Sequence, residues 1–297
     1  YDQDAVQADL TITFTAMKPG LLNGPATALC GQVEVAAIGI DERLVDQYAG
    51  GQTIIDWGMV KACFSPRPAD SHKGTFGRLT ALCGSYGMAG AAALAVKAAQ
   101  RSGAGLVTLA LPRSVYPIAA GMLPEAVFLP LPETPDGRVA LSARTTLREA
   151  ARSATALLVG CGLGGGDEVR EVVRDLLESA ECPLVLDADG INAVAGHIHI
   201  GKTARVSVVL TPHPGEMARL IGCRIEDVQQ NRVETARSFA EEQKAVVVLK
   251  GYQTVIAAPG RAVLLNKSGN PGMAAAGSGD VLAGMIASLI AQGMEPA

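Results

Sequence analysis

Residues 78–111, RLTALCGSYGMAGAAALAVKAAQRSGAGLVTLAL, decide the fold class of this chain. The short apolar run at 78–83 is typical of a buried strand, and a glycine-rich turn follows it. Alanine dominates 89–101, which favours a helix, and the apolar run at 106–111 predicts a second strand. Strand, helix and strand in this order predict a βαβ unit with parallel strands.

The same alternation continues toward the C-terminus. One helix is predicted with Asp167 at its cap position, and the last helix is predicted to start near Gly279. Further short buried strands are predicted at 156–160, 184–187, 206–210 and 246–250. We therefore expect an α/β fold with a mostly parallel central sheet and helices on both faces.

Polar or glycine residues follow the predicted strands at their carboxyl ends. Ligands of such sheets bind beyond those ends, so these clusters should converge on one crevice. The clusters come directly after Cys83, Gly160, Leu186, Leu210 and Leu249.

The N-terminal part of the sequence does not show this alternation of strands and helices. Alternating residues at 9–14 predict a half-buried strand with Leu10, Ile12 and Phe14 on its apolar face, and 32–38 predicts a second strand. Two strands need a larger sheet, which this chain does not supply. The stretch 41–72 is predicted to be a connector, because the SPRP motif at 65–68 breaks helices.

Composition narrows the function classes. The 297 residues are 48% apolar, and the net charge of −4 is spread over the chain without a basic stripe, which argues against nucleic-acid and membrane-surface binding. The six cysteines form no CxxC pair, and several lie in apolar runs. This pattern favours buried, reduced thiols in a cytoplasmic protein, and no cluster has structural zinc spacing.

The strongest local motif is GSGD at 277–280, followed by an apolar run. Glycines before a helix expose backbone N–H groups, and the helix N-terminus adds partial positive charge, so this turn favours a phosphate. Asp280 could then accept a proton from a hydroxyl that attacks the phosphate. From these residues alone, an ordinary first-turn acid is the somewhat favoured alternative.

Three further motifs allow two readings each. KGYQT at 250–254 could hold nucleotide phosphates or form a solvated hairpin, and the loop LTPHPGE at 210–216 could present a functional His213 or a surface histidine. DADG at 187–190 could orient Mg²⁺ through water or cap a helix. His197 and His199 are expected in a surface loop without function.

Taken as an ordered set, these motifs resemble the ADP/ATP-dependent NAD(P)H-hydrate dehydratases, a branch of the ribokinase-like fold. The resemblance covers about residues 70–297 and includes HKG at 72–74, GCGLG at 160–164, DADG at 187–190, LTPHPGE at 210–216 and GNPGM at 269–273. Residues 9–40 resemble the end of the NAD(P)H-hydrate epimerase domain that is often fused ahead of the dehydratase in bacteria. The resemblance implies three parts: an epimerase remnant at 1–41, a linker at 42–71, and a C-terminally truncated dehydratase domain at 72–297.

The resemblance also implies a reaction and roles for residues. The hydroxyl on C6 of hydrated NADH or NADPH would be phosphorylated by ADP or ATP with Mg²⁺, and phosphate would then leave. The implied catalytic residues are Asp280 as base and Gly277, Ser278 and Gly279 as anion hole. The implied nucleotide-binding residues are Lys250, Gly251, Tyr252, Gln253, Thr254, Asn270, Pro271, Gly272, Met273 and Gly279. The implied substrate contacts are Ala91, Gly162, His213 and Asp280.

Two positions depart from the family pattern: Ala275 stands where threonine is frequent, and Cys161 stands where proline is usual. The alternative function is a kinase of a small vitamin-precursor alcohol with the same fold. The resemblance implies a homo-oligomer acting on a small molecule, and no epimerase activity, because the catalytic segments of that domain are absent. The missing initiator Met leads us to expect a piece of a longer protein.

Overall fold

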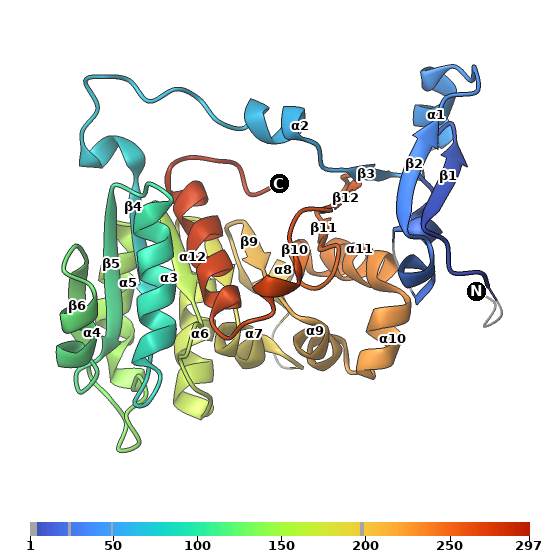
Figure 1. The fold of residues 1–297 in the computed structure, drawn as a ribbon. Coiled ribbons are helices and arrows are strands. Elements are labelled where there is room, and N and C mark those ends of the chain that lie inside the picture. The colour runs from blue at the N-terminus through green and yellow to red at the C-terminus, as the bar shows by residue number, and fades with distance from the viewer. Residues whose placement is uncertain (1–4, 23–24, 49, 197–198) are drawn as a thin grey trace.

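The computed structural model describes residues 5–22, 25–48, 50–196 and 199–297 (Figure 1). Its main feature is a ten-stranded sheet, parallel except where β11 pairs with β10 and with β12. In spatial order the strands are β3 (Gln52–Ile54), β12 (Val263–Leu265), β11 (Val255–Ala257), β10 (Val246–Leu249), β9 (Val208–Leu210), β8 (Leu184–Leu186), β7 (Ala156–Val159), β4 (Arg78–Leu82), β5 (Leu106–Pro112) and β6 (Val127–Leu131).

Helices cover both faces of this sheet, and each face has its own apolar core. One layer contains α3 (Ala89–Arg101), α4 (Tyr116–Met122) and α12 (Ser278–Ala291). The other contains α5 (Arg144–Arg152), α6 (Asp167–Ser179), α7 (Asp189–Val194), α8 (Ile200–Thr203), α9 (Pro214–Ile221), α10 (Ile225–Gln230) and α11 (Arg232–Gln243). The predicted α/β class, with a mostly parallel sheet and helices on both faces, is confirmed.

The described part of the chain also contains short 3-10 helices. They span Pro19–Leu21, Pro25–Leu29, Lys73–Phe76, Leu141–Ala143 and Pro271–Met273. None of the helices within the described ranges is long and apolar enough to cross a membrane.

Strand and helix positions follow the sequence pattern closely, with shifts at the ends. The predicted helix at 89–101 is α3, but Asp167 is the first residue of α6 and not its cap. The cap is Gly166, whose φ of +122° is a conformation that side chains other than glycine rarely adopt. Asp167 therefore still places its charge in the first turn, where the helix dipole favours it.

The N-terminal strands form a separate two-stranded parallel sheet of β1 (Leu10–Phe14) and β2 (Gln32–Ala36), set apart from the central sheet in Figure 1. The predicted burial of the apolar face of β1 is wrong within this chain: Leu10, Ile12 and Phe14 are 46%, 55% and 56% exposed. Thr13, on the opposite face, is buried. In a two-stranded sheet, only the face against which the neighbouring chain folds back is covered. In β1 that face carries Thr13 and not the three apolar residues.

The predicted connector contains ordered elements. It holds α1 (Glu42–Tyr48), β3 and α2 (Trp57–Ala62), and β3 pairs with β12 at one end of the central sheet. The stretch 42–71 is thus more than a linker, because three of its residues extend the main sheet. Periodicity could not reveal so short a strand.

Candidate active site

Four side chains meet where the neighbouring strands β7, β8, β9 and β10 end. Asp187 is buried, and its Oδ1 accepts hydrogen bonds from the Thr211 hydroxyl at 2.6 Å and from Lys250 Nζ at 2.7 Å. Its Oδ2 lies 3.7 Å from the Cys161 sulfur. The expected convergence of polar residues at the carboxyl edge of the sheet is therefore present.

Asp280 reaches the same cluster from the first turn of α12. Gly277 caps this helix with a φ of +85°, and a Cβ there would lie 2.3 Å from Leu94 Cδ1. The left-handed backbone at Gly277 favours glycine, and the Ser278 N–H donates to the Ala275 carbonyl at 3.3 Å. The helix dipole makes the start of α12 favourable for an anion. The turn therefore has the construction of an anion site, with a carboxyl group beside it.

The pKa of Asp280 is raised from its ordinary value. Burial is the largest cause, and the charge of Asp187 adds to it. A hydrogen bond from Cys161 and the charge of Lys250 act in the opposite direction and offset part of the rise. A carboxylate with a raised pKa is a better proton acceptor, so the environment suits a general base.

Lys250 links this carboxyl cluster to the glycine turn. Besides Asp187, its Nζ lies 3.8 Å from Glu216 Oε2. A Cβ at Gly279 would lie 3.3 Å from the same Nζ, so the ammonium group sits against the start of α12. An ammonium group here can bind the anion that the turn favours.

Below the turn after β10, Arg232 is buried and donates to the carbonyl oxygens of Leu249, at 3.0 Å, and Lys250, at 3.3 Å. Burial lowers the pKa of its guanidinium group. Arg232 was not predicted from the sequence, because an arginine inside a helical stretch looks like an exposed surface residue. Its role here is to fix the backbone that carries Lys250.

His213 and Glu216 form the N-terminal cap of α9. The N–H groups of Gly215 and Glu216 donate to His213 Nδ1, and the N–H of His213 donates to Glu216 Oε2 at 2.7 Å. The His213 side chain is half exposed, whereas Glu216 is buried. The loop thus presents an imidazole at the carboxyl edge, as the sequence analysis expected.

The predicted substrate contacts Ala91 and Gly162 are neighbours. A Cβ at Gly162 would lie 2.9 Å from the Ala91 Cβ, and the Gly162 carbonyl accepts a hydrogen bond of 2.8 Å from the buried Ser85 hydroxyl. This contact holds the turn after β7 against the start of α3. The two residues therefore share one wall beside the Cys161 position.

The remaining predicted nucleotide contacts lie in exposed loops. Tyr252 is 79% exposed, and Gln253 has a φ of +55°. The Thr254 hydroxyl donates to the Gly251 carbonyl. The amide oxygen of Asn270 caps the 3-10 helix Pro271–Met273 by accepting from the Gly272 N–H. Most of these hydrogen bonds are local, but the Thr254 carbonyl accepts from the Asn266 N–H at 2.9 Å. The nucleotide contacts of these residues stay predictions.

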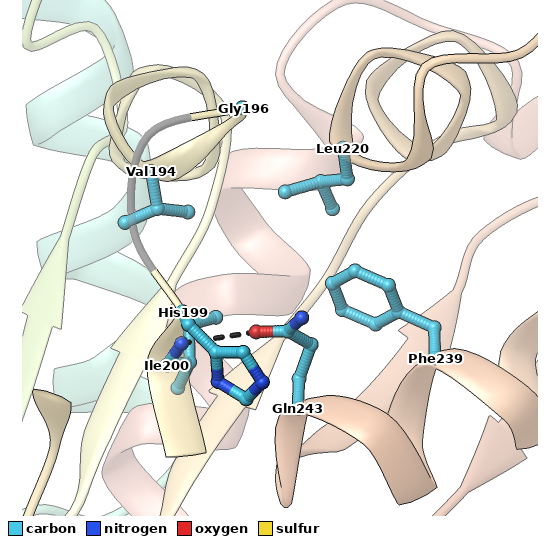
Figure 2. Close-up of a pocket in the computed structure, with 7 residues that line it drawn as sticks. All are labelled: Val194, Gly196, His199, Ile200, Leu220, Phe239 and Gln243. Atoms are coloured by element: carbon cyan, nitrogen blue, oxygen red, sulfur yellow. Dashed lines mark hydrogen bonds between the residues drawn. The ribbon is translucent and has the colours of Figure 1, made fainter. Parts of the chain in front are cut away.

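A separate cavity of about 240 Å³ lies away from the cluster, among α7, α8, α9 and α11 (Figure 2). His199, expected in a surface loop, instead precedes α8 and lines this cavity beside Gln243, whose side chain accepts from the Ile200 N–H. His197 lies outside the described residues. The cavity contains none of the predicted site residues.

The chain is similar to proteins of one known family. The family model described as NAD(P)H-hydrate dehydratase matches residues 79–297. A bifunctional NAD(P)H-hydrate repair enzyme of Moorella thermoacetica is 43% identical over 98% of this chain, which spans about half, 55%, of that relative. An ADP-dependent (S)-NAD(P)H-hydrate dehydratase of Neisseria meningitidis is 40% identical over 78% of this chain and 75% of its own length.

Two solved structures are also similar to this chain. The ADP/ATP-dependent NAD(P)H-hydrate dehydratase of Bacillus subtilis, co-crystallised with ATP and Mg²⁺, has a TM-score of 0.69 and 36% identity, over 80% of this chain and 81% of that one. A ribokinase-like protein of Enterococcus faecalis has a TM-score of 0.71 and 27% identity, over 83% of this chain and 82% of its own. The chain therefore belongs to the NAD(P)H-hydrate dehydratase family.

Proposed function

We propose that this chain dehydrates the S form of NADH hydrate and NADPH hydrate, using ADP or ATP as phosphoryl donor. The observation that carries the proposal is the position of Asp280, which lies between the glycine turn and the buried cluster and whose pKa is raised, chiefly by burial. The relatives named for this reaction support it.

In the proposed reaction Asp280 takes the proton of the C6 hydroxyl as its oxygen attacks the terminal phosphorus of the donor. The bond from that phosphorus to the nucleotide breaks, and the glycine turn at 277–279 stabilises the charge on the transferring group. Phosphate then leaves C6 with the bonding electrons, C5 loses a proton to solvent, and the ring double bond between C5 and C6 is restored. Phosphate is a far better leaving group than hydroxide, which is why the phosphorylation is needed.

Lys250 through Thr254 and Asn270 through Met273 would hold the donor nucleotide. Ala91, Gly162 and His213 would contact the hydrated dinucleotide. The position of Lys250 against Gly279 supports this division, because it places one positive charge beside the anion turn.

Mg²⁺ would arrive with the phosphates of the donor. The described residues do not form a cage for it, because Mg²⁺ requires oxygen ligands in near-octahedral geometry and the donors that converge here include the Cys161 thiol. No step above depends on the ion.

The proposal extends to the arrangement of the chain: an epimerase remnant at 1–41, a linker at 42–71 that also supplies β3, and the dehydratase domain at 72–297. We also propose that the protein forms a homo-oligomer in the cytoplasm. Light scattering of the purified chain tests whether it is an oligomer. The exposed apolar face of β1 is consistent with a remnant of a larger sheet.

Replacement of Asp280 tests the proposed function. Asp280→Asn should lower kcat by about 10²–10⁴-fold, the usual contribution of a general base, while the dissociation constant for ADP stays within about threefold. Absorbance of reduced nicotinamide and released phosphate measure the turnover, and calorimetry measures the binding. Asp167→Asn is the matched control, because Asp167 is also a first-turn acid but is exposed on α6.

Turnover of Asp280→Asn at the parent rate would overturn the proposed base. A stable phosphomonoester that accumulates without reduced nicotinamide would instead favour the alternative, a small-alcohol kinase of the same fold. One product analysis of the parent protein decides between the dehydratase and the kinase.

A further inference from the structure

The cluster at the carboxyl edge contains a set of donor atoms that the proposed reaction does not use. The Cys161 sulfur and one carboxylate oxygen each from Asp187 and Asp280 all lie within 4.8 Å of one another. We propose that these three residues form a binding site for a thiophilic divalent cation such as Zn²⁺ or Cd²⁺, and that a cation bound there inhibits the enzyme.

The geometry admits an ion of this size. Three atoms no more than 4.8 Å apart share a centre within about 2.8 Å of each, against ligand distances of about 2.0–2.3 Å for zinc, so a small inward shift completes the contacts. The Asp280 side chain belongs to the more accessible α12 turn, whereas Cys161 and Asp187 are buried. A cation entering past Asp280 would therefore reach the other two donors.

The carboxylate of Asp187 is already oriented for such a ligand. Thr211 and Lys250 both bind its Oδ1, which leaves Oδ2 facing the Cys161 sulfur. Polar partners that fix a ligand in this way are typical of metal sites and strengthen metal binding.

Charge and ligand type decide the class of cation. With Cys161 as thiolate, the three donors carry three negative charges, and Lys250 compensates one of them. A divalent cation neutralises the remaining two. Thiolate selects zinc-like or softer ions over Mg²⁺, and the thiol proton is released to solvent as the metal–sulfur bond forms.

Inhibition follows from the identity of the ligands. The oxygen of Asp280 that binds the cation is unavailable to accept a proton from the substrate hydroxyl. This part rests on the proposed function, whereas the binding itself does not.

Cadmium titration of the full chain tests the site. The exposed Cys63 and Cys223 are first replaced by serine in every protein, so that they do not bind the probe. In this background, thiolate-to-cadmium charge-transfer absorbance should rise and saturate at one equivalent. Mg²⁺ in large excess should leave the signal in place; loss of the signal at equimolar Mg²⁺ would contradict a thiophilic site.

Two alanine variants locate the sulfur ligand. Cys161→Ala should weaken cadmium binding more than about a hundredfold, beyond the roughly 10–100-fold that loss of an outer-shell partner costs. Cys83→Ala is the matched control, because Cys83 is equally buried and hydrogen bonds to Cys161 but is outside the set of three. As a neighbour of the ligand and not a ligand itself, Cys83→Ala should weaken binding by no more than about 100-fold, clearly less than Cys161→Ala. An equal loss in both variants would replace the proposed site with a dithiol site and overturn the proposal.

Asp280→Asn provides a second route if Cys161→Ala does not fold. The variant should also weaken cadmium binding about tenfold or more, and unchanged affinity would exclude Asp280 as a ligand and overturn the proposal. Buffered Zn²⁺ should inhibit turnover reversibly, with full recovery on adding EDTA, and undiminished turnover with the site saturated would refute the inhibition. If the parent protein has no dehydratase activity, the absorbance titration still decides the metal site.

Discussion

Gly277 constrains the backbone next to the proposed base. It combines a left-handed backbone with the close approach of Leu94, three residues before Asp280 in the sequence. Any side chain at this position must move Leu94 or the turn itself. The position of the anion turn therefore depends on the absence of one methyl group.

Gly277→Ala should lose both stability and turnover. The left-handed conformation costs about 1–2 kcal/mol for alanine, and the clash with Leu94 adds to it. Because the displaced turn is the proposed anion site, kcat should fall by about tenfold or more. Chemical denaturation and the dehydration assay measure the two effects.

Gly260→Ala is the control that separates the cost of backbone strain from an effect on the proposed reaction. Gly260 has a φ of +68°, but a Cβ there would meet no atom within 4 Å. It should show a similar cost in backbone strain with unchanged kcat. Equal losses of kcat in both variants would mean that the turn at Gly277 has no special place in the reaction.

Individual site residues could be predicted from the sequence where a motif marks the end of a strand or the start of a helix. The glycine turn, Asp280 and Lys250 follow from strand ends and helix starts, which the sequence marks clearly. Arg232 and Cys161 were not assigned a place in the site, because their importance comes from neighbours far away in sequence. Short-range patterns carry no information about such contacts.

Helices α3 and α12 pack side by side on one face of the sheet (Figure 1). Gly284 of α12 lies against the backbone of Ala95 in α3. A Cβ at Gly284 would lie 2.1 Å from the Ala95 carbonyl oxygen. The same contact determines how closely α12 approaches α3, and with it where Asp280, one turn earlier in α12, lies.

Gly284→Ala should destabilise the protein by about 1–3 kcal/mol, the usual cost of overpacking, and should lower kcat because α12 is pushed outward. Gly121→Ala in α4 is the opposite case, because its Cβ would meet no atom within 4 Å. There the better helix propensity of alanine should stabilise the protein by about 0.5–1 kcal/mol. Urea denaturation compares them; two changes of the same sign would contradict the packing argument.

Elements of the central sheet were predictable because their strands are buried on both faces and read as continuous apolar runs. Elements at the ends of the sheet were not. β3 and β12 have three residues each, and β6 includes Pro130, so none shows a clear pattern. Pairing with a neighbour, and not local preference, makes them strands.

The six cysteines divide by environment across the whole molecule. Cys63 and Cys223 are exposed, whereas Cys182 is buried and the loss of hydration raises the pKa of its thiol to about 11. Thiolate is the reactive form, so iodoacetamide at mildly alkaline pH should label the exposed pair in the native protein and spare Cys182. Mass spectrometry after digestion measures the labelling.

Unfolding in guanidinium chloride provides the control, because Cys182 should then react like any free thiol. Labelling of Cys182 in the native protein at the rate of Cys63 would contradict its buried position. The comparison needs no assumption about function.

The pairing of β3 with β12 has a consequence for the behaviour of the protein in solution. The N–H of Val263 donates to the Gly51 carbonyl and the N–H of Ile55 to the Leu265 carbonyl, so this short segment occupies the open side of β12. A bare strand edge is a template for pairing between molecules and a route to aggregation. The segment that the sequence presents as a simple connector is thus the outermost strand of the central sheet, and a shortened chain without it would leave the edge of β12 unpaired and open to other copies.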